Sequence, residues 1–215
     1  MGLAAGLDRT GQRVGELATT GIGHVEIGTL TNPGKLNIRY RTRQRRTRVG
    51  ISVASSRPGL DQAVIEDYTR LIKELHSHCD FIIANLSSPD YARHGDTPGI
   101  GRLLDALKLE HQKYRHTPYI PLLIKVTVPE GAARLPEAVS IARDKMLDAV
   151  IISSPCLQLL ERAARLLNSI AVISVGGIST AEEAKKRLDA GAALVQVHSA
   201  FAQRGCAAIA ELLNG

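Results

Sequence analysis

The sequence predicts a compact (β/α)₈ barrel, the TIM-barrel type of α/β fold, and three observations favour it. Short β-branched runs alternate with amphipathic segments along the 215 residues. Eight such runs are present, and most are continuously apolar, as in parallel strands that helices cover. The seventh run ends in two glycines that lead directly into a helix-start signal, which is typical of the phosphate-binding end of such a barrel.

The eight predicted strands are the apolar runs at residues 3–6, 24–29, 48–54, 81–87, 121–127, 149–154, 171–177 and 193–199. An open flavodoxin-like sheet is the alternative. Such a sheet usually has roughly five or six strands, so the strand count favours the closed barrel. A chain of 215 residues is near the lower end of the range for this fold, so we expect short or missing βα loops.

The amphipathic segments between these strands predict helices at residues 10–20, 60–76, 100–115, 132–146, 157–168, 181–189 and 206–213. In the second of them Val64, Tyr68 and Leu71 are spaced four and three apart, so they share one helix face. Thr180 followed by Glu183 marks a helix start. No clear helix occupies the segment between the second and third strands.

Composition indicates a globular protein in one domain, residues 1–215. Hydrophobic residues make up 44% and charged residues 22%, which excludes a disordered chain. No apolar run approaches the roughly 20 residues needed to span a bilayer, and no signal peptide is evident, so we expect no membrane association and a cytoplasmic location. Three widely spaced cysteines without CxxC pairing are typical of free thiols, not of a metal site or disulfides.

The net charge of +6 has a local origin, because six arginines between Arg39 and Arg48 carry as many positive charges. A solvated basic loop is one interpretation of this run. Contact with RNA or another polyanion is a second, although Tyr40 is the only aromatic residue within it. An acidic partner protein is a third.

Polar and glycine residues gather where the predicted strands end, which is the functional end of a (β/α)₈ barrel. Gly176 and Gly177 let backbone N–H groups approach an anion at a helix N-terminus, and His198 and Ser199 follow the neighbouring eighth strand. A tight turn with a helix cap would also explain the glycines. The pairing with the eighth strand favours phosphate.

Lys125 and Asn85 end two neighbouring strands. A lysine within an apolar strand is costly to bury unless a negative group meets it. The side chain could extend outward, whereas an inward Lys125 would suit the pyrimidine edge of a flavin. Asn85 can offer amide donors and acceptors to a ring. Turn chemistry alone would explain the Ser-Ser-Pro segment that follows Asn85.

Taken together, these motifs resemble dihydroorotate dehydrogenase of class 2, in the same order along essentially the whole chain. The segments that carry the resemblance are Gly2-Leu3-Ala4-Ala5-Gly6-Leu7-Asp8-Arg9, Glu26-Ile27-Gly28-Thr29, Asn85-Leu86-Ser87-Ser88-Pro89, Lys125, Val175-Gly176-Gly177-Ile178 and Ala190-Gly191-Ala192-Ala193-Leu194-Val195-Gln196. The resemblance implies a flavoprotein of pyrimidine biosynthesis that binds FMN and oxidises a dihydropyrimidine by hydride transfer to the flavin.

The resemblance also assigns site residues by position. Ser88 matches the catalytic base, and Lys125 would stabilise the reduced flavin. The positions matching cofactor contacts are Ala5, Gly6, Thr29, Asn85, Lys125, Ser153, Gly176, Gly177, His198 and Ser199. Those matching substrate contacts are Arg9, Asn85, Asp90 and Ser154. No metal is implied. A serine hydroxyl is a poor base, so this chemistry needs a closed, desolvated loop.

Several positions depart from the family pattern. Arg9 replaces a lysine, Ser52 an asparagine, and His198 a tyrosine, while Ser153-Ser154 replaces Thr-Asn. Asp90 replaces an asparagine and would repel an anionic substrate. Two whole segments are also missing, a substrate-binding stretch between strands two and three and a glycine-rich loop after strand six.

These departures leave two alternatives to a catalytic flavoprotein. One is a degenerate barrel that binds a phosphate ligand or a partner without redox catalysis. The other is an RNA-acting flavoprotein that uses the arginine run. Substrate, electron acceptor and oligomeric state, a homodimer included, stay open.

Overall fold

The computed structural model is a closed barrel of parallel strands that pair in sequence order, with the last strand beside the first. The strands are β1 (Gly2–Leu3), β2 (His24–Leu30), β3 (Arg48–Val53), β4 (Phe81–Asn85), β5 (Leu122–Thr127), β6 (Ala149–Ser153), β7 (Ala171–Val175) and β8 (Leu194–Val197). The fold is therefore the predicted (β/α)₈ barrel. The structure describes residues 1–37, 46–87, 97–114 and 118–214.

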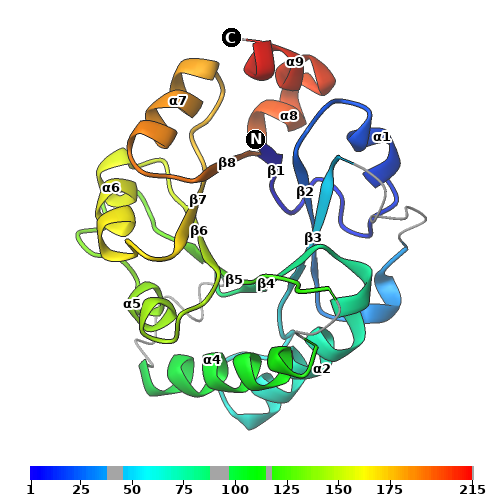
Figure 1. Ribbon diagram of the computed structural model, residues 1–215, viewed down its shortest axis with the longest axis vertical. Helices are drawn as coiled ribbons and strands as arrows, with labels where there is room; N and C mark the ends of the chain where they lie inside the picture. Colours follow the sequence, from blue (N-terminus) through cyan, green and yellow to red (C-terminus); the bar gives the residue numbers. More distant parts are fainter. Residues whose placement is uncertain (38–45, 88–96, 115–117, 215) are drawn as a thin grey trace.

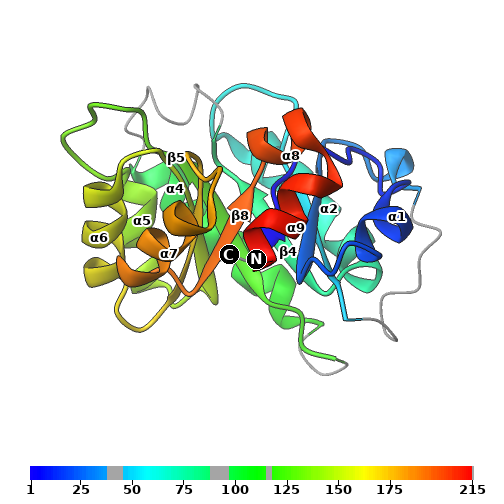
Figure 2. The same ribbon diagram turned by 90° about the horizontal axis from the view of Figure 1, so that it is seen from above.

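Helices surround this ring of strands (Figure 1), and Figure 2 shows the same molecule from above. The helices are α1 (Val14–Ala18), α2 (Gln62–Leu75), α4 (Thr97–Gln112), α5 (Glu137–Asp144), α6 (Leu157–Leu166), α7 (Ala181–Asp189), α8 (Ser199–Arg204) and α9 (Cys206–Asn214), with short 3₁₀ turns η1 (Pro33–Lys35) and η3 (His76–His78). Between β2 and β3 the described residues contain only η1, as expected from the absence of a helical pattern there.

Differences from the predicted elements have local causes. The helix predicted at 10–20 begins only at Val14, because the Asp8 carboxylate accepts hydrogen bonds from the N–H groups of Thr10, Gly11 and Arg13 and holds them in a loop. The helix predicted at 132–146 begins only at Glu137, after an extended Pro136. α8 has no counterpart among the predicted helices, and its first residue, Ser199, falls within the predicted eighth strand.

The main core lies between the outer face of the strands and the helices. α2 shows how the sequence builds it: Asp61 caps the helix through a bond from the Val64 N–H, and the buried residues Tyr68, Leu71 and Ile72 face the barrel. Burying an aliphatic side chain such as Leu71 or Ile72 contributes about 1.5–3 kcal/mol. This packing of helices on the outer face of the barrel fixes where each strand ends and therefore where the site residues lie.

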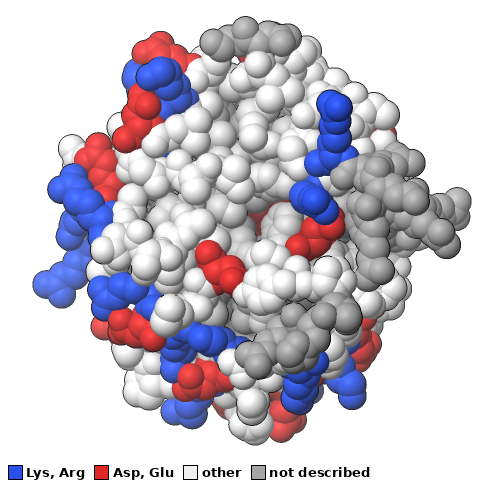
Figure 3. Space-filling model, in the orientation of Figure 1, with Lys and Arg blue, Asp and Glu red and all other residues white. Residues whose placement is uncertain are grey.

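At the N-terminal ends of the strands, two aromatic rings fill part of the barrel interior. His24 and Phe81 lie over Gly2 and Gly50, where a Cβ atom would come within 2.0 and 2.1 Å of the two rings. Beyond them is a cavity of about 910 Å³ with Leu123 among its apolar walls. Figure 3 shows the centre of this face hollowed, with a few charged side chains around the hollow.

The described residues contain no helix that is long and apolar enough to cross a membrane. Nor do they bring three His, Cys, Asp or Glu side chains together as metal ligands. Cys79, Cys156 and Cys206 are free thiols.

Candidate functional site

The candidate site lies at the C-terminal ends of the strands, and β2 shows how its backbone is shaped. Gly28 has φ +110°, and a Cβ atom there would lie 2.6 Å from the Ser52 carbonyl oxygen, so only glycine fits. The β2–β3 register shifts between Ile27 and Leu30. Such a bulge redirects the side chains next to it. Here it brings Thr29 to the neighbouring strand ends.

Thr29, Ser52 and Asn85 form a hydrogen-bonded cluster across β2, β3 and β4. The Asn85 Nδ2 donates to Thr29 Oγ1 at 2.8 Å, and Thr29 Oγ1 lies 3.3 Å from Ser52 Oγ. Asn85 Oδ1 accepts from the Ser87 N–H at 3.0 Å, and the Tyr68 hydroxyl donates to the Asn85 carbonyl at 2.7 Å. Asn85 is therefore held in one orientation, with its amide half-buried at the barrel mouth.

Lys125 points into the barrel beside Asn85, its register partner on the neighbouring strand. Its ammonium donates to both carboxylate oxygens of Glu26 on β2, at 3.1 and 2.9 Å. The Glu26 side chain is fully buried and that of Lys125 is 11% exposed. The lysine therefore has the negative partner that its burial requires.

Gly176 and Gly177 form a glycine cradle between β7 and α7, with φ of +104° and +66°. A Cβ atom at Gly176 would lie 3.1 Å from the Ser154 carbonyl oxygen, so a side chain is excluded there. Within the described residues, no hydrogen bond uses the N–H groups of Gly176, Gly177 or Ile178. These donors precede α7, whose N-terminus is closed by a capping box between Thr180 and Glu183. The cradle can therefore offer N–H groups to an anion.

The remaining predicted phosphate and ring contacts end β8 and β1. A Cβ atom at Gly6 would lie 3.1 Å from His198 Nε2, so these two strand ends adjoin. His198 is exposed and its side chain makes no cap bond to α8, which begins at the exposed Ser199. Ala5 is half-buried in the turn after β1.

Ser153 and Ser154 end β6 beside the glycine cradle. The Ser154 N–H donates to the Val175 carbonyl at 2.9 Å, and the Ser154 hydroxyl accepts from the Cys156 N–H at 3.2 Å. Ser153 is half-buried, whereas Ser154 is 2% exposed and used within its own turn.

Other predicted residues are not brought into this arrangement. Arg9 is exposed, and within the described residues no ion pair holds it in the site. Ser88 and Asp90 lie outside the described residues, as do Arg39, Arg41, Arg43 and Arg45 of the arginine run. At the described end of the run, Arg48 pairs with Asp80 at 3.3 Å.

Sequence reasoning did not identify Glu26 as a site residue. The signal was present, because Glu26 is the only charge in the apolar run from Val25 to Leu30. Arg187 was also missed. It lies in the last turn of α7, where a basic residue looks like ordinary helix chemistry.

Fold and site together define a class: a (β/α)₈ barrel with a polar interior cluster and a glycine cradle for an anion at the same end. The comparisons with known proteins agree with this. The profile of the family described as dihydroorotate dehydrogenase matches residues 147–215, which include the cradle.

The chain resembles dihydroorotate dehydrogenases over nearly its whole length, as a divergent relative. The dihydroorotate dehydrogenase (quinone) of Methylobacillus flagellatus is 25% identical over 268 residues, covering 95% of this chain and 80% of the relative. The enzyme of the same name from Streptomyces coelicolor is 28% identical over 277 residues, covering 95% and 73%. These alignments are longer than the chain of 215 residues, so the relatives contain stretches without a counterpart here. That agrees with short or missing loops.

Solved structures show the same fold. The dihydroorotate dehydrogenase of Eimeria tenella in complex with ferulenol has a TM-score of 0.79 and 20% identity, covering 99% of this chain and 80% of the other. The ligand-free form has a TM-score of 0.82 and 17% identity, covering 99% and 82%.

Proposed function

We propose that this protein is an FMN-dependent oxidoreductase that oxidises a dihydropyrimidine-like ring, as the names of its relatives suggest. The observation that carries the proposal is the placement of two features at one end of one barrel. These are the polar side chains of Thr29, Asn85 and Lys125 and the cradle of Gly176 and Gly177.

The described residues fit FMN. At the cradle, side chains are excluded and N–H groups are unused, which suits a phosphate group. We propose that Ser199, His198 and Ser153 border the phosphate and that Ala5 and Gly6 border the flavin. Thr29 and Asn85 would hold the flavin ring through the hydroxyl and amide groups that their own cluster positions.

When bound, FMN would supply the acceptor for the hydride that the ring substrate loses. Lys125 would place a charged N–H donor near the flavin, and Glu26 fixes where that charge lies. Because the Glu26 carboxylate neutralises much of the Lys125 charge, the pair would mainly orient the flavin and would add little electrostatic attraction to it.

We propose that the substrate contacts Asn85, Ser154, Arg9 and Asp90. The Oγ of Ser88 would accept the proton that leaves the substrate carbon. A carboxylate at Asp90 would disfavour an anionic ring. The preferred substrate is therefore proposed to be a neutral dihydropyrimidine or a ring whose carboxylate is turned toward Arg9.

Turnover by FMN-loaded protein tests this function, with dihydroorotate and dihydrouracil as substrates and reduction of a dye as the readout. We expect Ser88→Ala to lower kcat at least about 100-fold, the usual scale for loss of a general base. Ser87→Ala is the matched control and should keep its activity.

Oxidation of neither ring would contradict the proposed substrate class. Full activity of Ser88→Ala would contradict the proposed base. FMN retained with no turnover of any ring would favour the non-catalytic barrel, for which the missing segments and Asp90 are the motivation.

A further inference from the structure

Arg187 is a buried cation in the last turn of α7, with 5% of its surface exposed. Its guanidinium donates from Nη1 to the Ser154 carbonyl at 2.9 Å and from Nη2 to the Pro155 carbonyl at 2.7 Å. Burial lowers the pKa of Arg187, but an arginine side chain stays charged at neutral pH. The charge therefore sits inside the protein, bonded to two neutral carbonyl groups.

No carboxylate within the described residues forms an ion pair with Arg187. Glu183, one turn earlier on α7, instead accepts bonds from Ser179 and Thr180. A buried charge without a counter-charge is costly. The Glu183 carboxylate favours the charged form of Arg187 through space, so the fold maintains a buried positive charge that is only partly balanced and that a bound anion would balance further.

The guanidinium lies directly against the glycine cradle. A Cβ atom at Gly177 would come within 3.1 Å of Arg187 Nη2 and 3.4 Å of the Pro155 Cα, and Gly176 packs on the Ser154 backbone. Two carbonyl oxygens at the end of β6 would repel an anion at the cradle. Arg187 binds both of them and thus removes much of this repulsion.

We propose that Arg187 is the positioning residue of the anion site: it clamps the β6–α6 turn against the glycine cradle and supplies the buried counter-charge for a phosphate group there. The inference rests on the proposed function only in identifying that phosphate as the one carried by FMN. An anion site at the cradle would need the same residue for any phosphate ester.

The test compares FMN with riboflavin, which has the same ring but lacks the phosphate. The affinities of wild type, Arg187→Met and Arg187→Lys for both flavins would be measured by fluorescence quenching of the ligand. Binding of inorganic phosphate would be measured by its competition with FMN or, in the absence of flavin, by calorimetry. We expect Arg187→Met to weaken FMN binding roughly 10- to 100-fold, the usual loss when a supporting residue behind a site is removed. Riboflavin affinity should change less than about threefold.

Two variants sharpen the result. Arg187→Lys keeps the charge but not the two-pronged bond to the carbonyls, so it should fall between wild type and Arg187→Met. Arg165→Met is the matched control, because Arg165 is an exposed arginine on the neighbouring α6, with 77% of its side chain accessible, and its loss should leave both affinities unchanged.

Equal losses of FMN and riboflavin affinity in Arg187→Met would overturn the inference, because they would indicate a merely structural role. An unchanged FMN affinity would overturn it as well. If wild type binds inorganic phosphate but not FMN, the proposed function fails while the inference is tested on phosphate alone. If wild type binds neither, the cradle is not an anion site and the inference is wrong.

Discussion

Glu26 and Lys125 form the least exposed ion pair of the described chain, with side chains 0% and 11% accessible. The two residues are 99 positions apart and meet only because the barrel closes. A buried pair of this kind adds little net stability compared with apolar residues, but breaking it leaves an uncompensated charge. We infer that it fixes the position of the Lys125 ammonium beside Asn85.

Removing one member of this pair should therefore cost more than removing both. We expect Lys125→Met to lower the free energy of unfolding by about 3–5 kcal/mol, because it leaves the Glu26 carboxylate buried alone. The double variant Lys125→Met with Glu26→Leu should recover most of the loss. Urea unfolding of the four members of this double-mutant cycle measures the coupling, and additive losses would contradict the account.

We expect the buried His24 to make the stability of the protein depend on pH. Burial lowers the pKa of His24 to about 4 from an ordinary value of 6.5, and its Nε2 lies 3.2 Å from Gln196 Nε2. In the unfolded chain His24 binds a proton as the pH falls below 6.5, whereas in the folded protein it binds a proton only near pH 4. Stability should therefore fall as the pH falls through this window, by about 3 kcal/mol at most from this residue.

The variant His24→Gln should lose that part of the pH dependence. Urea unfolding at pH 7 and pH 4.5 would be compared for wild type, His24→Gln and the control His78→Gln, whose histidine is exposed. A slope that is the same in all three proteins would show that His24 does not titrate as proposed.

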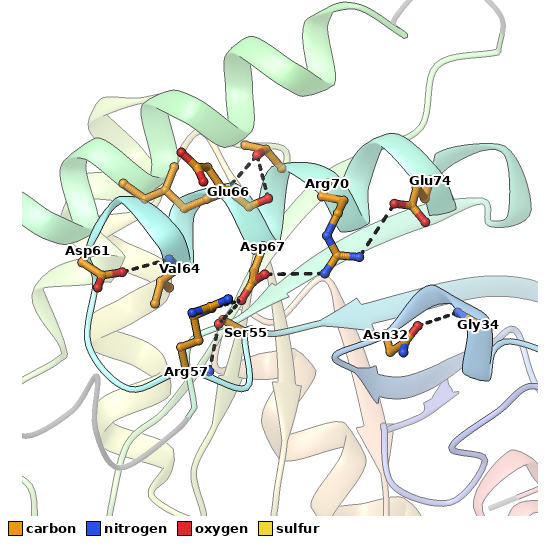
Figure 4. A network of polar contacts seen from close by, with 12 residues as sticks. Asn32, Gly34, Ser55, Arg57, Asp61, Val64, Glu66, Asp67, Arg70 and Glu74 are labelled. Atoms are coloured by element: carbon orange, nitrogen blue, oxygen red, sulfur yellow. Dashed lines mark hydrogen bonds and ion pairs between the residues drawn. The ribbon is translucent and has the colours of Figure 1, made fainter.

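At the scale of elements, a polar network fixes the loop between β3 and α2 (Figure 4). Asp67 on α2 accepts from Ser55 Oγ at 2.7 Å and from Arg57 Nε at 3.2 Å, and it pairs with Arg70 at 3.5 Å. The Ser55 hydroxyl in turn accepts from the Arg57 N–H at 3.0 Å. This loop follows Ser52, so the network supports the edge of the candidate site.

Asp67→Ala should loosen this loop without unfolding α2. We expect the backbone amides of residues 55–60 to exchange hydrogen roughly fivefold faster, a modest factor because the pairs are partly exposed. Glu66→Ala, next to it on α2, removes only a contact with Gln62 and serves as the control. Equal exchange rates in both variants would contradict a role of Asp67 in holding the loop.

At the scale of the whole molecule, the strands could be predicted because each is a local apolar run. The sequence leaves the direction of Lys125 open, because a lysine in an apolar strand can also extend outward, and the structure shows it pointing inward to Glu26. Glu26 and Arg187 could not be placed from sequence, since their roles depend on residues brought together by barrel closure and by packing of α7 on the end of β6. α1 begins later than predicted because the Asp8 carboxylate binds N–H groups that precede the helix. The spacing of apolar residues in the sequence does not reveal such a bond.

In the proposed complex a flavin phosphate binds at the glycine cradle while the ring contacts Asn85 and Lys125. The most direct measurement is the visible absorption spectrum of the protein after incubation with FMN and removal of free ligand by gel filtration. We expect a flavin spectrum in near-stoichiometric amount, and we expect its loss in Gly177→Val, whose side chain would meet the Arg187 guanidinium at the cradle. A colourless wild-type protein after this treatment would contradict it.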